Sequence, residues 1–379
     1  MYILVAPDKF RGSLEASEVC QSISDGIHLA YPDAEIVNIP LADGGEGTTR
    51  ILTERSNGKF VTAIVRDPLG RYIEAEYGIS GDGATAFIEM AAASGLNLLK
   101  PFEQNPLLTS TIGTGELIVH AIEAGVEEII LGIGGSATTD AGIGMAYALG
   151  YEFFDENNEA LAPIGGNLSR IKLISSEKVY HRLKPIRFTV ACDVTNPLYG
   201  ESGAAYVYGP QKGASKTMVS QLDQGLQNIA AVAAETFGYD VSEKPGTGAA
   251  GGLGAGVLWF LNAELREGVG IVMERCDIEN HVKKADLVIT GEGKVDEQTL
   301  SGKVVKGLAD LCQKYQVPLA VVCGTLMITS TETKGAGITY AVSVLNRPMT
   351  LTQAEDEAYS LVRDATFQLV RLFFHSGQK

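Results

Sequence analysis

The stretch "GIGGSATTDAGIGMAYALG", residues 132–150, decides the fold class because it follows the apolar run "EIIL", residues 128–131. A strand that runs into a glycine turn and then into a helix is typical of doubly wound α/β sheets. Gly132, Gly134 and Ala137 also match the G-x-G-x-x-G/A spacing of dinucleotide-binding proteins. The following hydroxyls and carboxylate exceed what that motif requires, so the motif alone leaves both a hydride cofactor and a phosphate donor open.

The remaining chain shows βα alternation at both ends and a different pattern between them. Residues 59–90 read as three alternating strands joined by hairpin turns, which indicates a second domain. We therefore predict a discontinuous doubly wound parallel-sheet domain, Rossmann- or flavodoxin-like, from residues 1–58 and 270–379. Residues 59–269 form an inserted mixed α/β domain in this prediction. The expected elements of the first segment are a strand at 3–6, a helix at 14–29 with Ser13 as N-cap, a strand at 36–40, and a helix after Gly47.

Bulk composition limits the classes of partner. A chain of 379 residues is longer than the roughly 250–300 residues that share a single hydrophobic core, so we expect two domains. Its 46 acidic and 30 basic residues give a net charge of −16. This charge argues against a nucleic-acid or anionic-membrane surface. The five scattered cysteines contain no C-x-x-C pair, the first residues read as a strand, and no apolar run reaches about 18 residues. We expect a cytoplasmic protein without nucleic-acid or membrane partners, and the sequence leaves a homo-oligomer open.

Charged loops follow several predicted strands, where open α/β sheets bind ligands. In "APDKFRGSL", residues 6–14, Asp8, Lys9 and Arg11 precede a helix, and two cations there suit a carboxylate or phosphate. In "LADGGEGT", residues 41–48, the acidic groups are either helix-dipole partners or ligands for Mg²⁺ or a substrate hydroxyl.

Two further loops carry candidate catalytic groups. Asp193 leaves an apolar strand in "ACDVTNPLYG", so it either accepts a hydroxyl proton at a cleft edge or caps an Asx turn. Lys212, in "GPQKGAS", offers a charge for phosphates, although a lone loop lysine is more often exposed to solvent.

The densest loop is "ITGEGKVDEQTLSGK", residues 289–303, whose alternating acids and lysines suit a metal–phosphate site. The glycines of "GTGAAGGLGAG", residues 246–256, suit either an anion at a helix N-terminus or close helix packing. A Walker A sequence occurs nowhere, so any ATP site uses a different cradle.

Seven segments together resemble the glycerate kinase type 1 family, in order and over nearly the whole chain. That resemblance implies ATP-dependent phosphorylation of D-glycerate, with Mg²⁺, on a two-domain α/β fold without a P-loop. It favours 2-phosphoglycerate as product, whereas the residues themselves leave O2 and O3 both open. The segments are "APDKFRGSL", "PLADGGEGT", "GIGGSATTDAGIGMAYALG", "ACDVTNPLYG", "YGPQKGA", "GTGAAGGLGAG" and "ITGEGKVDEQTLSGK".

A physical reading of the same loops assigns roles to single residues. Asp193 is the expected base, with Lys9 as a second catalytic group, and Asp43 and Asp140 are the next candidates. Asp296 and Asp43 are the expected Mg²⁺ ligands. The expected substrate-binding residues are Asp8, Lys9, Arg11, Asp43, Ser136, Thr138 and Asp140, and the expected nucleotide-binding residues are Gly134, Gly135, Gly251, Gly252, Gly254, Lys294 and Lys303.

Two alternatives from other classes stay open. An NAD-dependent dehydrogenase of a small hydroxy acid would use Gly132, Gly134 and Ala137 for pyrophosphate and Asp155 for the ribose. It leaves the loop "GEGKVDEQ" unexplained, because hydride transfer does not need it. A non-catalytic anion-binding module would explain the glycines and cations but not the surplus of carboxylates.

Overall fold

The computed structural model describes residues 1–301 and 303–375, so Gly302 of the densest loop and residues 376–379 of the expected outer domain lie outside the description. The chain divides into two compact units, Met1–Asp43 with Val269–Lys379 and Gly44–Gly268. Helix α2 (Thr48–Arg55) thus belongs to the second unit, whereas we expected it in the outer segments. That each unit folds as an independent domain stays a prediction.

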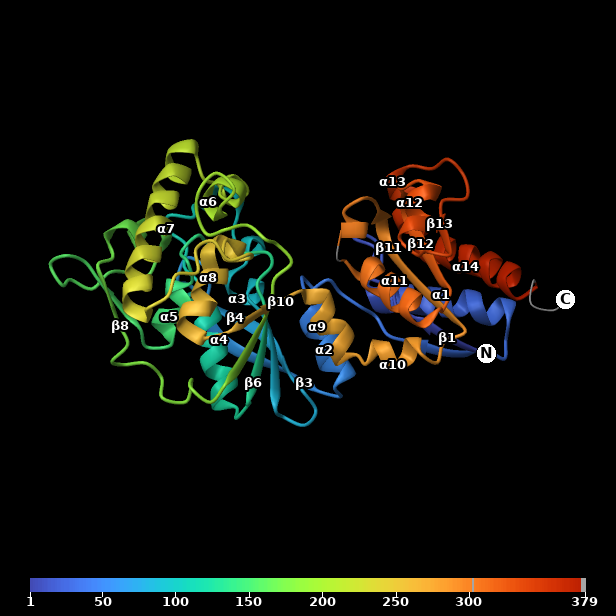
Figure 1. Cartoon of the computed structure of the whole chain (residues 1–379), viewed down its shortest axis with the longest axis horizontal. Coiled ribbons are helices and arrows are strands. Elements are labelled where there is room, and N and C mark those ends of the chain that lie inside the picture. The colour runs from blue at the N-terminus through green and yellow to red at the C-terminus, as the bar shows by residue number, and fades with distance from the viewer. Residues whose placement is uncertain (302, 376–379) are drawn as a thin grey trace. The chain divides into compact units, whose positions relative to one another are not determined.

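The first unit is built on a five-stranded parallel sheet in the order β13-β12-β11-β1-β2 (Figure 1). From β1 the chain continues to β2 on one side, and from β11 it continues to β12 and β13 on the other. The strand order therefore reverses between β1 and β11, which confirms a doubly wound sheet. The strands are β1 (Tyr2–Val5), β2 (Glu35–Asn38), β11 (Leu287–Val295), β12 (Leu319–Leu326) and β13 (Tyr340–Ser343).

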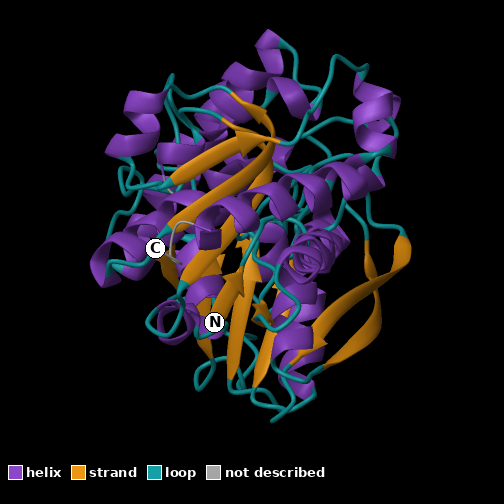
Figure 2. Cartoon of the chain, turned by 90° about the vertical axis from the view of Figure 1, so that its right-hand side faces the viewer, coloured by secondary structure: helices purple, strands orange, loops and turns teal. Residues whose placement is uncertain are grey.

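Helices cover both faces of this sheet (Figure 2). On one face, α1 packs with α14, and Val19, Ile23 and Ile27 of α1 enter the core at a spacing of one helical turn. Helix α11 contacts β11 and β12 and, like α1, follows the strand it packs against. The helices are α1 (Ala16–Ala30), α9 (Gly268–Arg275), α10 (Ile278–Val282), α11 (Val304–Tyr315), α12 (Ser330–Gly335), α13 (Leu351–Asp356) and α14 (Ala358–His375).

The start of α1 differs from the prediction. Glu15 is the N-cap, in a capping box with Glu18, whose carboxylate accepts the Glu15 N–H at 2.9 Å. Ser13 was expected at that place, but its hydroxyl donates to the Phe10 carbonyl and closes a tight turn with the preceding loop. Because Glu15 and not Ser13 is the N-cap, α1 begins two residues later than predicted. The loop that carries Asp8, Lys9 and Arg11 is longer by the same amount.

The second unit contains a six-stranded mixed sheet in the order β10-β9-β6-β5-β4-β3. Strands β5, β6, β9 and β10 run parallel, and β3, β4 and β5 form the three-stranded antiparallel meander that the alternating sequence predicts. The strands are β3 (Lys59–Arg66), β4 (Tyr72–Ile79), β5 (Thr85–Glu89), β6 (Glu128–Gly132), β9 (Arg187–Ala191) and β10 (Glu264–Arg266), with a separate pair, β7 (Glu152–Phe154) and β8 (Leu173–Ser175).

Two helices of this unit depart from the simple strand–turn–helix reading. Helix α5 begins only at Ile143, so an irregular loop of residues 133–142 separates it from β6. Helix α8 is interrupted near its start, where Gly251 and Gly252 have φ values of 70° and 90°. The further helices are α3 (Ala91–Ser94), α4 (Ile112–Glu123), α5 (Ile143–Ala148), α6 (Ala204–Tyr208), α7 (Lys216–Phe237) and α8 (Ala249–Leu261). Within the described residues, no helix has both the length and the apolar character needed to span a membrane.

Candidate active site

In the first unit, the loop after β1 lies where the strand order reverses. The Asp8 N–H donates to the Gly291 carbonyl of β11 at 2.9 Å, which fixes this loop against β11. Arg11 carries an exposed side chain, and its Nη2 lies 3.9 Å from Asp43 Oδ2 after β2. The crevice beyond the carboxyl ends of strands at such a reversal is the usual ligand site of open α/β sheets. The structure thus brings together the cations and acids that the sequence places in two separate loops.

Carboxylates at this crevice repel one another. Burial raises the pKa of Asp8 to about 7, helped by the charges of Asp43 and Glu292 and opposed by the Lys9 N–H, which donates to Asp8 Oδ1 at 2.7 Å. Burial likewise raises the pKa of Glu292, opposed by a hydrogen bond from the Thr299 side chain and by the charge of Lys303, while Asp296 and Asp43 add to the rise. Glu292 Oε1 is buried without a hydrogen-bond partner. Such a group of carboxylates is stabilised by an added cation.

Lys294 and Asp296 take a different arrangement from the expected phosphate and metal ligands. Their side chains form an ion pair of 2.8 Å, Lys294 Nζ to Asp296 Oδ2. Asp296 Oδ1 also accepts the N–H groups of Gln298 and Thr299 at 3.0 and 3.3 Å. Both carboxylate oxygens are therefore occupied by the protein, and Asp296 is a turn-forming residue in this structure. Lys303, before α11, acts instead on Glu292, whose pKa its charge lowers.

In the second unit, the carboxyl ends of β5, β6 and β9 meet at one edge of the sheet. Gly132 is in register with Glu89 on one side and with Ala191 on the other. Beyond this edge lie Gly134 and Gly135, both exposed, and the φ of 73° at Gly135 requires a residue without a side chain. These two residues, which we call the Gly134–Gly135 turn, are exposed glycines, the kind of backbone from which phosphate cradles are built.

Two carboxylates flank this edge. Glu89 Oε1 accepts the N–H groups of Gly47 and Thr49 at 3.1 and 3.0 Å and so holds the start of α2. Asp193 is exposed rather than partly desolvated as expected, and its Oδ1 accepts the Gly268 N–H at 2.7 Å. A carboxylate with one oxygen fixed in this way has a defined direction, which both the capping and the proton-accepting interpretations require.

Beneath the turn lies a buried polar network around Lys212. Lys212 is 2 % exposed, and its Nζ donates to Ser136 Oγ and to the Thr138 carbonyl, both at 2.6 Å. Burial lowers its pKa to about 7, and Asp140 opposes this effect. The lysine is thus part of the interior, which excludes the alternative of a solvent-exposed loop lysine, and its role as a charge for phosphates stays a prediction.

Asp140 is fully buried and organises the loop around it. Its oxygens accept the N–H groups of Thr111 at 2.8 Å and of Gly142 and Gly144 at 3.2 Å each, and the Thr111 hydroxyl at 2.8 Å. We expected both Asp140 and Thr138 to contact the substrate. Each is 0 % exposed, so neither side chain can touch a ligand in this structure. Asp140 instead joins the starts of α4 and α5.

The glycines of α8 are explained by close packing. A Cβ on Gly251 would lie 2.0 Å from the Thr138 carbonyl oxygen, and one on Gly254 would lie 2.0 Å from that of Gly246. Gly252 would meet Ala141 Cα at 3.0 Å. These glycines are buried against backbone, so the packing interpretation accounts for them without a ligand.

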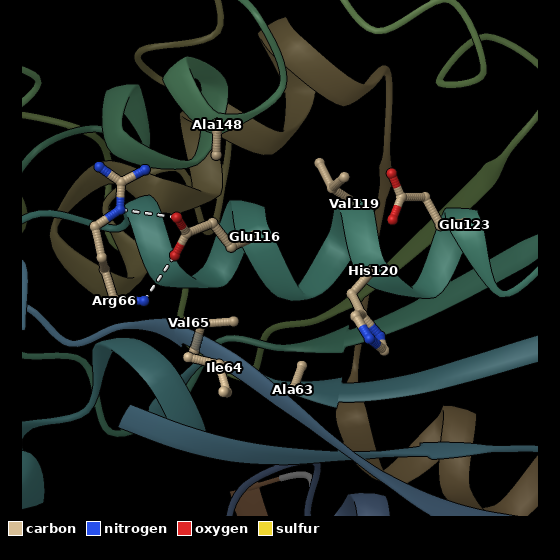
Figure 3. A pocket seen from close by; sticks show the side chains of 9 residues that line it. All are labelled: Ala63, Ile64, Val65, Arg66, Glu116, Val119, His120, Glu123 and Ala148. Carbon is tan, nitrogen blue, oxygen red and sulfur yellow. Dashed lines mark hydrogen bonds and ion pairs between the residues drawn. The ribbon is translucent and has the colours of Figure 1, made fainter. Parts of the chain in front are cut away.

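A cavity of about 260 Å³ lies elsewhere in this unit, between β3 and α4 (Figure 3). Three of its polar side chains already pair with the protein: Arg66 Nε donates to Glu116 Oε1 at 2.8 Å, and His120 Nδ1 lies 2.9 Å from the Tyr77 hydroxyl. No glycine loop borders it, so the two loop clusters remain the candidate site residues.

Three residues of these clusters were underestimated from sequence. Glu89 ends the apolar strand β5, and Glu292 follows the apolar first half of β11. A carboxylate after an apolar run is the signal that identified Asp193 and could have identified both. Lys212 gives no such signal, because its burial depends on packing between loops distant in sequence.

Two features of the structure argue against the NAD-dependent dehydrogenase alternative. The glycine turn does not open a helix, since α5 begins at Ile143. Asp155, the expected ribose ligand, pairs with Arg170 at 3.2 Å and caps the N–H groups of Asn157 and Glu159.

Comparison with known proteins gives one consistent result. The family model described as "Glycerate kinase family" matches residues 3–374. A protein named glycerate 2-kinase from Escherichia coli K12 is 46% identical over 359 residues, covering 95% of this chain and 94% of its own. The glycerate kinase of Halalkalibacterium halodurans is 45% identical over 363 residues, covering 96% of each chain. A crystal structure from Salmonella typhimurium LT2, described as a glycerate kinase 2, superposes with a TM-score of 0.91 at 42% identity and covers 100% of both chains. The chain, a two-unit α/β enzyme without a P-loop, therefore belongs to the glycerate kinase family.

Proposed function

We propose that this kinase transfers the γ-phosphoryl group of ATP to D-glycerate, with 2-phosphoglycerate as the favoured product. The observation that carries the proposal is the crevice of the first unit, where exposed Arg11 and the mutually repelling carboxylates Asp8, Asp43 and Glu292 share one strand reversal. A carboxylate substrate and a divalent cation are the two ligands that this combination suits. The choice of the 2-hydroxyl follows the name of the Escherichia coli relative.

The residues present fit Mg²⁺. Glu292 Oε1 is an orphaned buried oxygen, and Asp43 acts electrostatically on both Asp8 and Glu292. Over residues 1–301 and 303–375, no three acidic, histidine or cysteine side chains converge as a complete metal site. Mg²⁺ usually takes one or two protein carboxylates and completes its shell with water and phosphate oxygens. Asp43 and Glu292 are the proposed ligands, and the bound ion would neutralise charge on the transferring phosphoryl group.

The other roles follow from charge and exposure. Arg11 and Lys9 bind the glycerate carboxylate, and a guanidinium can do so through two parallel hydrogen bonds. The Gly134–Gly135 turn donates backbone N–H groups to phosphate oxygens. Asp193 accepts the proton of the reacting hydroxyl, with its direction fixed through the bond to Gly268.

The reaction is tested by incubating the purified protein with ATP, Mg²⁺ and D-glycerate. Release of ADP is expected, and phosphorus NMR of the product should show a phosphate on O2. L-glycerate and omission of Mg²⁺ serve as controls. A 3-phosphate product would overturn the assignment of the hydroxyl, and absence of ADP release would overturn the proposed reaction.

The metal assignment is tested by two matched amide variants of one loop. Glu292→Gln should raise the Mg²⁺ concentration for half-maximal activity by on the order of tenfold, because the amide lacks the charge that holds a hard cation. Asp296→Asn should leave it within about twofold, because Asp296 is already paired with Lys294. The reverse pattern would return the metal to Asp296.

A further inference from the structure

Lys212 is a buried cation that the roles assigned above do not use. Lys212 lies more than 70 positions after the Gly134–Gly135 turn in sequence. Its Nζ nevertheless donates to Ser136 Oγ and to the Thr138 carbonyl, both at 2.6 Å. Lysine is among the residues least often buried, because removing its charge from water is costly. Packing alone would be satisfied by a neutral side chain of similar size. The buried positive charge therefore calls for a functional explanation.

The groups around Lys212 show which part of the structure its ammonium group contacts. Asp140 is the charged group that raises its pKa, and Asp140 is itself saturated by four hydrogen bonds from Thr111, Gly142 and Gly144. The ammonium group donates to Ser136 and Thr138, which follow the turn. The preceding Gly134–Gly135 turn is exposed, and backbone N–H groups in general carry partial positive charge, the same sign as the ammonium group.

We propose that Lys212 is a positioning residue of the phosphate cradle: its ammonium group holds Ser136 and Thr138, fixes the Gly134–Gly135 turn, and places a positive charge directly behind it. The inference rests on the proposed function of this turn as a phosphate site. It extends that function by making the strength of the cradle depend on a side chain that does not touch the ligand.

The same arrangement makes phosphate binding depend on pH. With a pKa lowered to about 7, Lys212 loses its proton as the pH rises through neutrality. Its contribution to anion binding should therefore be full in mildly acidic solution and decline in alkaline solution. A lysine with a purely structural role would alter protein stability but not this dependence.

The test measures binding of inorganic triphosphate by calorimetry in the full-length protein, separately from catalysis. Lys212→Met, which keeps the length of the stem, should weaken binding by about 10- to 100-fold at about pH 6.5, and the gap from wild type should close toward about pH 9. Lys216→Met, at the exposed start of α7, is the matched control and should bind within about twofold of wild type. Equal binding by Lys212→Met and wild type, or a gap that does not change with pH, overturns the inference.

A second variant keeps the test decisive if Lys212→Met does not fold. Ser136→Ala removes one acceptor of the ammonium group and leaves the charge in place, so binding should weaken by about three- to tenfold. Unchanged binding by this variant overturns the inference. Glycerate phosphorylation by the wild type is measured in parallel: triphosphate binding that needs Lys212 in a protein without kinase activity would refute the proposed function alone.

Discussion

The conversion of Asp140 to asparagine should weaken the second unit more than any surface change of the same size. Asp140 Oδ2 accepts the Thr111 N–H, the Thr111 hydroxyl and the Gly144 N–H, and Oδ1 accepts the Gly142 N–H. An asparagine can place its oxygen at the Oδ2 position, but its NH₂ group then faces the Gly142 N–H. One buried donor loses its acceptor and meets a second donor.

The magnitude follows from these contacts. A hydrogen bond to a charged group contributes about 1.5–3 kcal/mol, and an unsatisfied buried donor costs about 1–3 kcal/mol, two descriptions that largely overlap. The attraction between Asp140 and Lys212 is lost as well, whereas the cost of burying a carboxylate is relieved. We expect Asp140→Asn to lower the free energy of unfolding by about 2–4 kcal/mol.

The single tryptophan supplies the assay. Trp259 lies in α8 of the second unit and is 3 % exposed, so its fluorescence reports unfolding of this unit during urea titration. Asp240→Asn is the control, because Asp240 is exposed and an amide oxygen can still accept the Ser242 N–H. A loss below about 1 kcal/mol for Asp140→Asn, or an equal loss for the control, would refute this account of the network.

Three further outcomes are expected. Arg11→Ala should raise the KM for glycerate by about 10- to 100-fold with little change in the KM for ATP, and an unchanged glycerate KM would remove Arg11 from the substrate site. Asp193→Asn should lower kcat by about 10²- to 10⁴-fold at nearly constant KM values, whereas retention of more than about a tenth of wild-type kcat would leave Asp193 as a capping residue. Asp8 has a folded-state pKa of about 7, above its ordinary value, so the folded state holds its proton more tightly and stability falls as the pH rises toward 7. In Mg²⁺-free buffer, Asp8→Asn should flatten this decline, as measured by urea unfolding between about pH 4 and pH 7, and parallel curves would contradict it.

The fold class was accessible from sequence because strand signals are local. Apolar runs such as residues 128–131 and the alternating meander at 59–79 were found at the expected places, and their pairing into two sheets follows from ordinary topology rules. The unit to which α2 belongs could not be predicted, because the sequence of a short helix does not show which sheet it packs against. Its start is held by Glu89, a contact between residues 40 and 42 positions apart.

The candidate site was predictable at the level of loops rather than of single side chains. Asp8, Arg11 and Asp43 were identified because charged residues follow strands, and the structure brings them together. Asp296 and Lys294 carry the same sequence signal, yet they pair with each other. Whether a charged side chain pairs locally or points to a ligand depends on rotamers and neighbours that a linear pattern does not encode.

The two ends of the second unit are in contact with each other. A Cβ on Gly44, at its first residue, would lie 2.5 Å from the Cα of Gly268, its last. A segment whose ends touch can be gained or lost between two neighbouring positions of a host chain with little cost in loop closure. Contact between the two ends is what a single insertion of residues 44–268 into an older sheet protein requires. We therefore expect this segment to be exchangeable between relatives as one piece.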